Sequence, residues 1–310
     1  MINEAPNYIR KPFFYFRYLL YVVFLFIIGK QLRIYHNINI MTISETLDIL
    51  KKGNNTSIIR FGDGEMNIIA RNDIGFQSES LSLSEKMKVV LNTRDATLLI
   101  SIPNIFGSLK SFDIEAEYYW ITHREEYYDL YNSYIDSEYL YGDALVFRPY
   151  ICFNKKERKY VGSYFEQIKS LWYNKEIVII EGKYTRMGVG NDLFDGAKMI
   201  ERIICPSSNA YDKYQTILDN ALTINKEKLI LLSLGPCAKV LGYDMWKLGY
   251  HVLDIGHIDS EYEWYLHNVE WKKRMNNNKH YADIVDLENI VECQDVSYNS
   301  QILMDISGVN

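Results

Sequence analysis

Short apolar runs recur along this chain, and stretches with apolar residues at helical spacing separate them. Apolar runs of this length, ended by turn residues, are typical of strands buried on both faces of a sheet. Their alternation with helices predicts an α/β fold with a Rossmann-like, mostly parallel sheet and helices on both faces. The expected strands span residues 57–61, 97–103, 144–147, 176–182, 199–205, 228–235 and 250–256. The expected helices span residues 42–53, 113–135, 163–172, 210–222 and 238–249.

The loops that follow the strands are where a ligand is expected, because open α/β sheets bind ligands beyond the carboxyl ends of their strands. The first loop reads "GDGE". Its carboxylates, Asp63 and Glu65, are candidate ligands for Mn²⁺ or Mg²⁺, and Glu65 is also a candidate acid–base group. Arg60 would bind a phosphate, and Gly62 would let the backbone approach the ligand. In a purely structural alternative, Asp63 caps the next helix and pairs with Arg60.

The loop after residues 176–182 combines cations, glycines and a helix start, a combination that binds anions. Its spacing matches neither the Walker lysine loop nor the dinucleotide fingerprint. A tight turn with surface charges is the alternative interpretation. The candidate ligand-binding residues of this loop are Lys183, Arg186, Gly188, Gly190, Asn191 and Asp192.

Two shorter loops offer further contacts to a nucleotide. Asn209 can reach a base or ribose, although the serines that precede it favour simple helix capping. Gly235 and Pro236 lead straight into a helix whose first amides could hold a pyrophosphate. A plain strand-to-helix turn would explain the second loop equally well.

The last strand-end loop, residues 257–264, contains a second Asp-x-Glu pair. Asp259 and Glu261 are candidate catalytic carboxylates, and His257 could share the role of base or orient them. Together, these loops place acids, cations and glycine-led helix starts at successive strand ends. They therefore predict a metal-assisted site for a phosphorylated ligand.

Charge and cysteine content exclude other classes of protein. The formal net charge is −6 and no long basic run occurs, so a nucleic-acid partner is not expected. The four cysteines lie far apart without a Cys-x-x-Cys pair, which argues against a zinc site or a disulfide framework. A reducing cytoplasm fits this pattern best.

The N-terminal segment differs from the rest, so we divide the chain into residues 1–40 and a domain at 41–310. Residues 13–29 are apolar except for Arg17, but their uninterrupted part is shorter than the roughly 20 residues that span a bilayer. No small-x-small cleavage site follows. Three interpretations stay open: a helix lying on the inner face of the plasma membrane, a true span, and a helix buried in the fold or in a homo-oligomer contact.

Four stretches together resemble the bacterial GT-D-fold glycosyltransferases. They are "IIRFGDGE", "FRPYI", "IIEGKYTRMGVGNDLFDGAKMIERIICPSSNAYDKY" and "LLSLGPCAKVLGYDMWKLGYHVLDIGHIDSEYEW", in the family's order, over roughly residues 42–270. The sequence departs from the family at Cys237, where a small hydroxyl or apolar residue is expected, and at Ser260, where an aliphatic one is expected. The N-terminal apolar segment lies outside the resemblance.

The resemblance implies a metal-dependent enzyme that moves a hexose, typically glucose, from a UDP-sugar to a growing protein-linked or lipid-linked surface glycan. The family's Asp-x-Glu metal motif maps to Asp63 and Glu65, although Asp259 and Glu261 form a second such pair. Another nucleotide or nucleotide-sugar phosphotransferase or hydrolase is the alternative enzyme. A non-catalytic, membrane-tethered partner in polysaccharide assembly is the alternative from another class.

Overall fold

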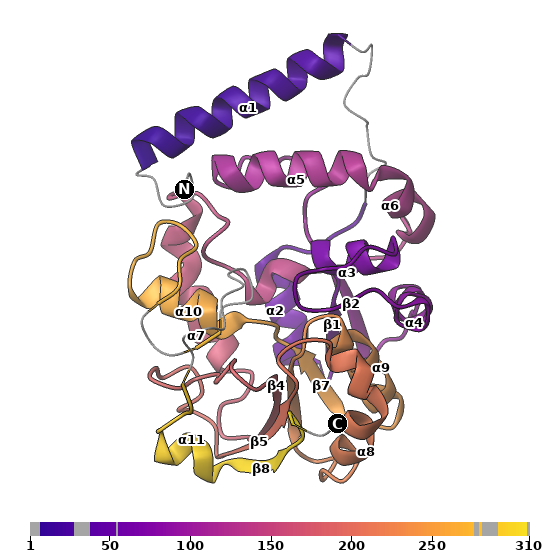
Figure 1. Ribbon diagram of the computed structural model, residues 1–310, viewed down its shortest axis with the longest axis vertical. Helices are drawn as coiled ribbons and strands as arrows, with labels where there is room; N and C mark the ends of the chain where they lie inside the picture. The colour runs from indigo at the N-terminus through magenta and orange to yellow at the C-terminus, as the bar shows by residue number, and fades with distance from the viewer. Residues whose placement is uncertain (1–6, 28–37, 54, 276–278, 281–290, 309–310) are drawn as a thin grey trace.

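A computed structural model of the protein describes residues 7–27, 38–53, 55–275, 279–280 and 291–308. Within these residues, eight strands form one sheet in the order β3-β2-β1-β7-β6-β4-β5-β8, and every neighbouring pair is parallel (Figure 1). The expected parallel α/β sheet is therefore confirmed. The strands are β1 Ser57–Arg60, β2 Leu98–Ile102, β3 Gly142–Asp143, β4 Glu176–Gly182, β5 Met199–Cys205, β6 Leu229–Ser233, β7 His251–Asp254 and β8 Ile302–Asp305.

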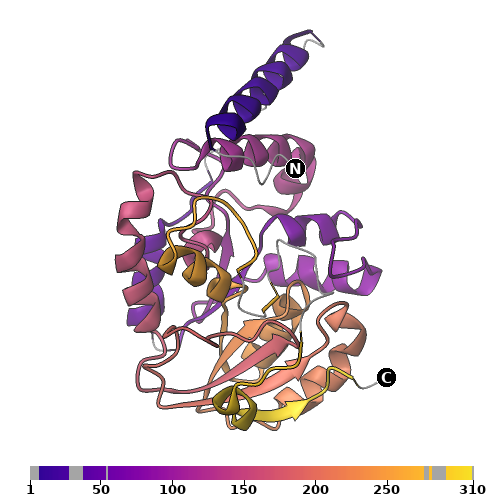
Figure 2. The same cartoon turned by 60° about the vertical axis from the view of Figure 1, so that its left-hand side comes forward.

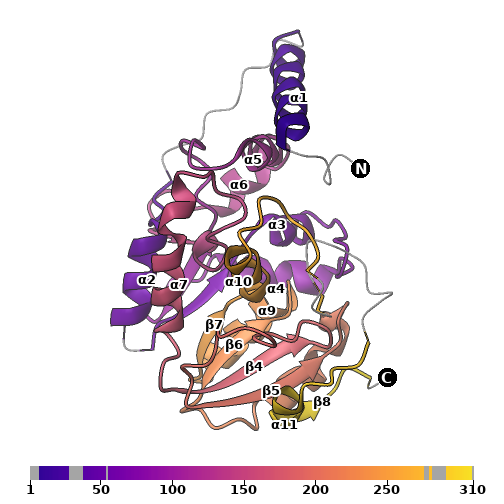
Figure 3. The same cartoon turned by 90° about the vertical axis from the view of Figure 1, so that its left-hand side faces the viewer.

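Helices cover both faces of this sheet. The helices α2 and α7 pack together on one face, whereas α9 packs on β1 and β7 from the other face with α4 and α8 beside it (Figure 3). Because helices cover both faces, β1, β2 and β6 are buried along their whole length. The helices are α1 Asn7–Ile27, α2 Ile43–Lys52, α3 Asp63–Ile69, α4 Leu81–Leu91, α5 Ile114–Glu126, α6 Tyr128–Tyr134, α7 Val161–Lys169, α8 Tyr214–Ala221, α9 Cys237–Lys247, α10 Ile258–Leu266 and α11 Val296–Ser300.

Local sequence explains why α2 begins where it does. The Thr42 side chain accepts a hydrogen bond from the Glu45 amide at 3.2 Å, and the Glu45 carboxylate accepts one from the Thr42 amide at 2.8 Å. This reciprocal pair is a capping box, which satisfies amides that the first helical turn leaves without partners. Ile43, Leu47 and Leu50 then form the buried face of the helix.

Three of the predicted elements are wrong in type or extent. Residues 144–147 form a 3₁₀ helix because Asp143, at the end of the two-residue strand β3, accepts a hydrogen bond from the Leu145 amide at 2.8 Å. The long helix predicted at 113–135 ends at Tyr127, which separates α5 from α6. The predicted loop at 257–264 is mostly helix α10, whose acidic first turn suits a helix N-terminus.

Three described elements carried no clear sequence prediction. The helix α4 lies between α3 and β2, and its N-cap Ser80 accepts a hydrogen bond from the Leu83 amide. The polar C-terminal segment adds α11 and the edge strand β8, whose Ile302 lies opposite Arg202 of β5.

The helix α1 is the outermost element, and it packs on α5 rather than on the sheet (Figures 1 and 2). Phe14 is buried in this contact, and the Arg17 guanidinium lies 5.2 Å from the centre of the Tyr118 ring. The expected N-terminal hydrophobic helix is thus present. Among the described residues, no helix combines the length and apolar character needed to cross a bilayer.

Candidate active site

A cavity of about 270 Å³ lies at the carboxyl ends of β1, β4, β6 and β7. Its lining includes Gly182 at the end of β4, Ser233 at the end of β6 and Gly256 just beyond β7. The volume is near the lower end of the range typical of small-molecule sites. Six of the residues predicted from sequence line it: Arg60, Gly62, Asp63, Glu65, Gly235 and His257.

Arg60 is a fixed charge in the wall of this cavity. Its Nε donates to the Asp254 carbonyl oxygen at 2.6 Å, and its Nη1 donates to the Ala144 carbonyl oxygen at 2.9 Å. Burial lowers the pKa of Arg60, and the nearby Asp254 carboxylate opposes that shift. A Cβ on Gly256, whose φ is +54°, would lie 2.1 Å from Arg60 Nη2, so only glycine fits beside the guanidinium. The partner of Arg60 is therefore Asp254, and not Asp63 as in the structural alternative.

Glu65 and Asp254 share a buried cation that sequence reasoning did not identify. Lys239 Nζ lies 3.1 Å from Glu65 Oε1 and 3.0 Å from Asp254 Oδ2. The second oxygen of Glu65 accepts a hydrogen bond from the Gly62 amide at 2.7 Å. Burial opposes the charged form of Lys239, but Asp254 and Glu65 outweigh it and raise the pKa of the ammonium. Lys239 is therefore a charged group at neutral pH, and it lines the cavity.

Asp63 is the predicted metal ligand that best fits a divalent ion. It begins α3, lines the cavity, and accepts a hydrogen bond through Oδ2 from the Tyr119 hydroxyl. Burial and the Asp63 carboxylate both raise the pKa of Tyr119, which keeps the phenol protonated as a donor. Magnesium is usually held by one or two carboxylates together with substrate phosphates. Among the described residues, no three acidic, histidine or cysteine side chains are grouped so that they could hold a metal ion. A metal at Asp63 would therefore need ligands from the substrate.

Glu65 fits a metal less well than Asp63 does. Both of its oxygens already have partners, Lys239 on one side and the Gly62 amide on the other. A metal at Glu65 would have to displace the Lys239 ammonium or lie close to it, which Coulomb repulsion disfavours.

The predicted anion loop turns its cations away from the cavity. Lys183 Nζ lies 3.8 Å from Glu292, and Arg186 Nη2 donates to the Val291 carbonyl oxygen at 2.7 Å. Neither side chain belongs to the cavity lining that the described residues form. The residues of this segment that do line the cavity are Gly182 and Thr185.

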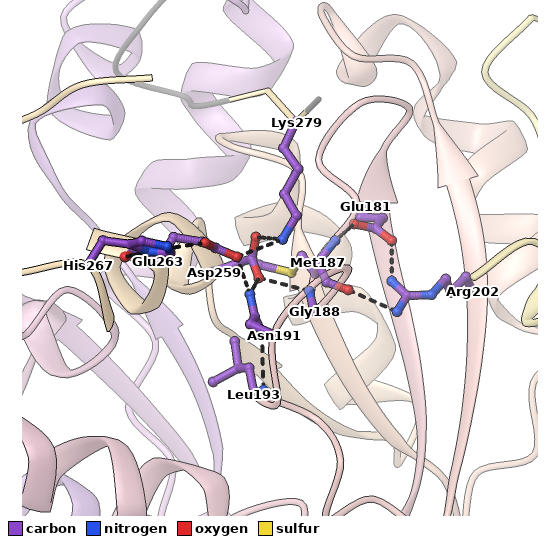
Figure 4. A network of polar contacts seen from close by, with 10 residues as sticks. All are labelled: Glu181, Met187, Gly188, Asn191, Leu193, Arg202, Asp259, Glu263, His267 and Lys279. Carbon is purple, nitrogen blue, oxygen red and sulfur yellow. Dashed lines mark hydrogen bonds and ion pairs between the residues drawn. The ribbon is translucent and has the colours of Figure 1, made fainter. Parts of the chain in front are cut away.

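The rest of that loop is bound to the second Asp-x-Glu segment (Figure 4). Asp259 accepts hydrogen bonds through Oδ1 from the Gly188 amide at 2.8 Å and from Asn191 Nδ2 at 2.9 Å. Its Oδ2 accepts from Lys279 Nζ at 2.8 Å. Gly190 lies between Gly188 and Asn191 in this turn and has a φ of +81°. Asp259 thus stabilises the conformation of the loop through these hydrogen bonds. Protein donors occupy both of its carboxylate oxygens.

Asp192 and Asn209 also have partners within the fold. Asp192 accepts hydrogen bonds from Lys169 Nζ at 2.6 Å and from the Tyr262 hydroxyl at 2.7 Å. Asn209 has a left-handed backbone, and its side chain accepts a hydrogen bond from the Ser78 amide at 2.7 Å. Asn209 therefore anchors the segment that carries Phe76, which does line the cavity.

Glu261 positions an arginine that the sequence analysis did not single out as a site residue. Its Oε2 accepts hydrogen bonds from the amides of Tyr150 and Ile151 at 3.0 and 2.9 Å, and its Oε1 lies 3.6 Å from Arg148 Nε. Glu261 is fully buried, whereas Arg148 reaches the cavity. The position of Arg148 after an apolar run and before Pro149 is the sequence signal that could have identified it.

The glycine turn after β6 is shaped by its neighbours. Gly235 has a φ of +52°, and a Cβ there would lie 2.4 Å from the Phe76 ring. Pro236 then serves as the N-cap residue of α9, and Lys239 follows within the first turn of that helix. The proximity of Lys239 to this turn is the signal by which sequence could have identified it. His280 also lines the cavity, and it lies outside every motif considered from the sequence.

A family model for the glycosyltransferase GT-D fold matches residues 58–284 of this chain. The probable glycosyl transferase Gly of Streptococcus gordonii is 39% identical over 272 residues, which are 87% of this chain and 39% of that protein. The glycosyltransferase GlyD of Streptococcus pneumoniae serotype 4 is 38% identical over 270 residues, which are 87% of this chain and 33% of that protein. The chain thus spans well under half the length of both curated relatives.

Two solved structures share the architecture. The first is a structure of the highly conserved domain of unknown function 1792, described as a distinct glycosyltransferase fold. It has a TM-score of 0.83 and 37% sequence identity, and the match covers 87% of this chain and 96% of that chain. Another, described as a new glycosyltransferase from Streptococcus sanguinis, has a TM-score of 0.81 and 39% identity, covering 86% of this chain and 99% of that chain.

Proposed function

This chain belongs to the GT-D-fold glycosyltransferase family, and on that premise we propose that it transfers a hexose, with glucose as first candidate, from a UDP-sugar to a growing surface glycan. The acceptor glycan would belong to a glycoprotein, a capsule or an exopolysaccharide. One observation carries the proposal: in the cavity at the carboxyl edge of the sheet, Asp63 shares the lining with three cations, Arg60, Arg148 and Lys239.

The charges of this cavity suit a diphosphate. The Lys239 ammonium is kept charged by Asp254 and Glu65, and Arg60 and Arg148 add two guanidinium groups to the same lining. The turn at Gly235 leads into α9, and amides at a helix N-terminus favour a bound phosphate. The donor diphosphate would therefore lie between α9 and the cations.

The reaction then needs a bond exchange at the anomeric carbon. An acceptor hydroxyl oxygen bonds to that carbon, the carbon–oxygen bond to the diphosphate breaks, and its electron pair leaves with UDP. Lys239 and Arg148 would stabilise the departing charge because they are already in place. The hydroxyl proton passes to a base. Of the four predicted bases, Glu65 and His257 line the cavity, and the bonds of Glu65 to Gly62 and Lys239 favour His257.

A divalent ion, Mn²⁺ or Mg²⁺, would be held by Asp63 and by oxygens of the donor diphosphate. When bound, such an ion supplies Lewis-acid stabilisation of the charge that develops on the leaving group. The Tyr119 hydroxyl would fix the orientation of the Asp63 carboxylate from its other side.

A thermal-shift screen of UDP, GDP, CMP and S-adenosylmethionine, with and without Mn²⁺, tests the donor class. We expect a shift with UDP that increases when Mn²⁺ is added and, in a separate assay, UDP release from UDP-glucose that a glycan acceptor accelerates. UDP release that no glycan acceptor accelerates would favour a phosphotransferase or hydrolase. A folded chain that binds none of the four compounds would favour a non-catalytic partner in polysaccharide assembly.

We also propose that α1 attaches the enzyme to the inner face of the plasma membrane. One face of the helix packs on α5 through Phe14, and the opposite face exposes apolar side chains. The helix also carries three basic residues in its sequence, Arg10, Lys11 and Arg17, and positive charge on such a helix suits anionic lipid. The exposed apolar residues are Phe16, Leu19, Leu20, Val23, Phe24 and Ile27.

A further inference from the structure

A second cavity, of about 870 Å³, lies between α1, α5 and the segments 148–155 and 270–272. It meets the cavity at the sheet edge, because Asp63, Trp120, Leu145 and Arg148 line both. A molecule in the second cavity could therefore reach the end of the first at Asp63, the proposed metal ligand. The two cavities together offer separate places for two substrates that must meet at one point.

The lining of the second cavity suits a saccharide. Aromatic rings are available to the apolar faces of sugar rings: Tyr15 is 59% exposed and Tyr119 is 42% exposed. Charged and amide side chains, including Lys110 and Asn154, are available as hydrogen-bonding groups for hydroxyls. A lipid chain fits less well, because it would cover these polar groups without replacing the hydrogen bonds they make to water.

We propose that this second cavity binds the acceptor saccharide and delivers one of its hydroxyls to Asp63. This inference rests on the proposed glycosyl transfer, and it identifies where the second substrate binds. It also gives α1 a role in the site, since Lys11, Phe14, Tyr15 and Arg17 line the cavity and lie outside the matched range 58–284. The N-terminal helix would then select acceptors that the family domain alone would not.

The test uses two adjacent aromatic residues of α1. Tyr15 and Phe16 are both 59% exposed, but Tyr15 lines the cavity and Phe16 does not. The full chain is assayed with UDP-glucose and a panel of p-nitrophenyl hexosides as acceptors, with transfer measured by product mass. UDP release without acceptor is measured in parallel. We expect Tyr15→Ala to raise the KM for the acceptor at least five-fold and to leave acceptor-free UDP release unchanged, whereas Phe16→Ala changes neither.

Two outcomes would count against the acceptor cavity. One is an equal acceptor KM in Tyr15→Ala and wild type, and the other is an equal loss in both variants. A wild-type chain that releases UDP but transfers to no hexoside would instead favour the hydrolase alternative and overturn the proposed function, as would a chain that neither binds UDP nor releases it from UDP-glucose. The parallel measurement therefore separates failure of the inference from failure of its premise.

Discussion

Lys239 and Glu65 form a buried ion pair, with Nζ 3.1 Å from Oε1 and side chains only 5% and 11% exposed. The pair joins the first turn of α9 to the first turn of α3, and Asp254 of β7 contacts the same ammonium group at 3.0 Å. Three segments that carry candidate site residues are thus held together by one ammonium group. The pair also occupies the second acid of "GDGE", so we propose that only the first binds a metal.

We expect Lys239→Met to destabilise the fold by about 3–5 kcal/mol, because it leaves the buried carboxylates of Glu65 and Asp254 without their shared cation. Urea unfolding followed by circular dichroism measures the change. Lys198→Met is the matched control. Lys198 pairs with Glu176 at 2.8 Å on the exposed surface, so its loss should change the free energy of unfolding far less. Equal effects of the two substitutions would contradict a structural role for Lys239.

We expect Asp63→Asn to abolish the Mn²⁺-dependent part of UDP binding, because Asp63 is the carboxylate that remains available to a metal. Glu65→Gln should retain metal dependence and lose stability, because it weakens the contact with Lys239. Thermal shifts with UDP, each with and without Mn²⁺, separate the two effects. Loss of metal dependence in Glu65→Gln at unchanged melting temperature would move the metal to Glu65.

Full metal-dependent activity in the double variant Asp63→Ala/Glu65→Ala would remove "GDGE" from the metal site altogether. The remaining Asp-x-Glu pair, Asp259 and Glu261, would then be the candidate. That outcome would require both acids to give up the donors that now occupy their oxygens.

The exposed face of α1 predicts binding to anionic vesicles. Burying a Phe or Leu side chain is worth about 1.5–3 kcal/mol, so Phe16→Ser/Leu20→Ser should weaken partitioning at least roughly ten-fold. Cosedimentation with phosphatidylglycerol-containing vesicles measures it, and added salt should weaken binding further. The control Leu81→Ser/Val89→Ser changes side chains of similar exposure on α4. Vesicle binding that responds equally to both pairs would exclude α1 as the attachment site.

The buried carboxyl of Asp143 predicts how the stability of the fold depends on pH. Burial raises the pKa of this carboxyl to about 7, well above its value of about 4 in the unfolded chain. Between these values the unfolded chain loses the proton and the folded chain keeps it. The free energy of unfolding should therefore fall as pH rises from 4 to 7, and this contribution should stay constant above that range.

Substituting Asp143→Asn should remove this fall, so the variant gains at least roughly 1 kcal/mol relative to wild type between pH 4.5 and pH 8. Urea unfolding at several pH values tests it. Asp95→Asn should leave the slope in place, because hydrogen bonds from Thr97 lower the pKa of that exposed carboxyl and it titrates below this range. An unchanged slope in Asp143→Asn would mean that another group titrates.

Local sequence was sufficient for most of the fold. Six of the seven predicted strands follow from patterns of a few neighbouring residues, and the structure confirms them. The errors have two causes, a side-chain hydrogen bond to the next turn and burial of polar residues by the tertiary structure. The apolar residues 144–147 suggested a strand, but β3 ends at Asp143, whose side chain binds the next turn. Helix α10 was hidden because its residues carry the polar pattern of a loop, although the core buries most of them.

The sequence by itself determined which residue types follow each strand, because strand ends and turns are set by nearby residues. Only the tertiary structure decided which of those residues share a cavity. Arg60 meets Asp254 across 194 residues of chain because β1 lies beside β7, and that strand order is not encoded in any local pattern. Buried charges must be paired, so strand order also decided which acids have protein partners on both carboxylate oxygens, as Glu65 does.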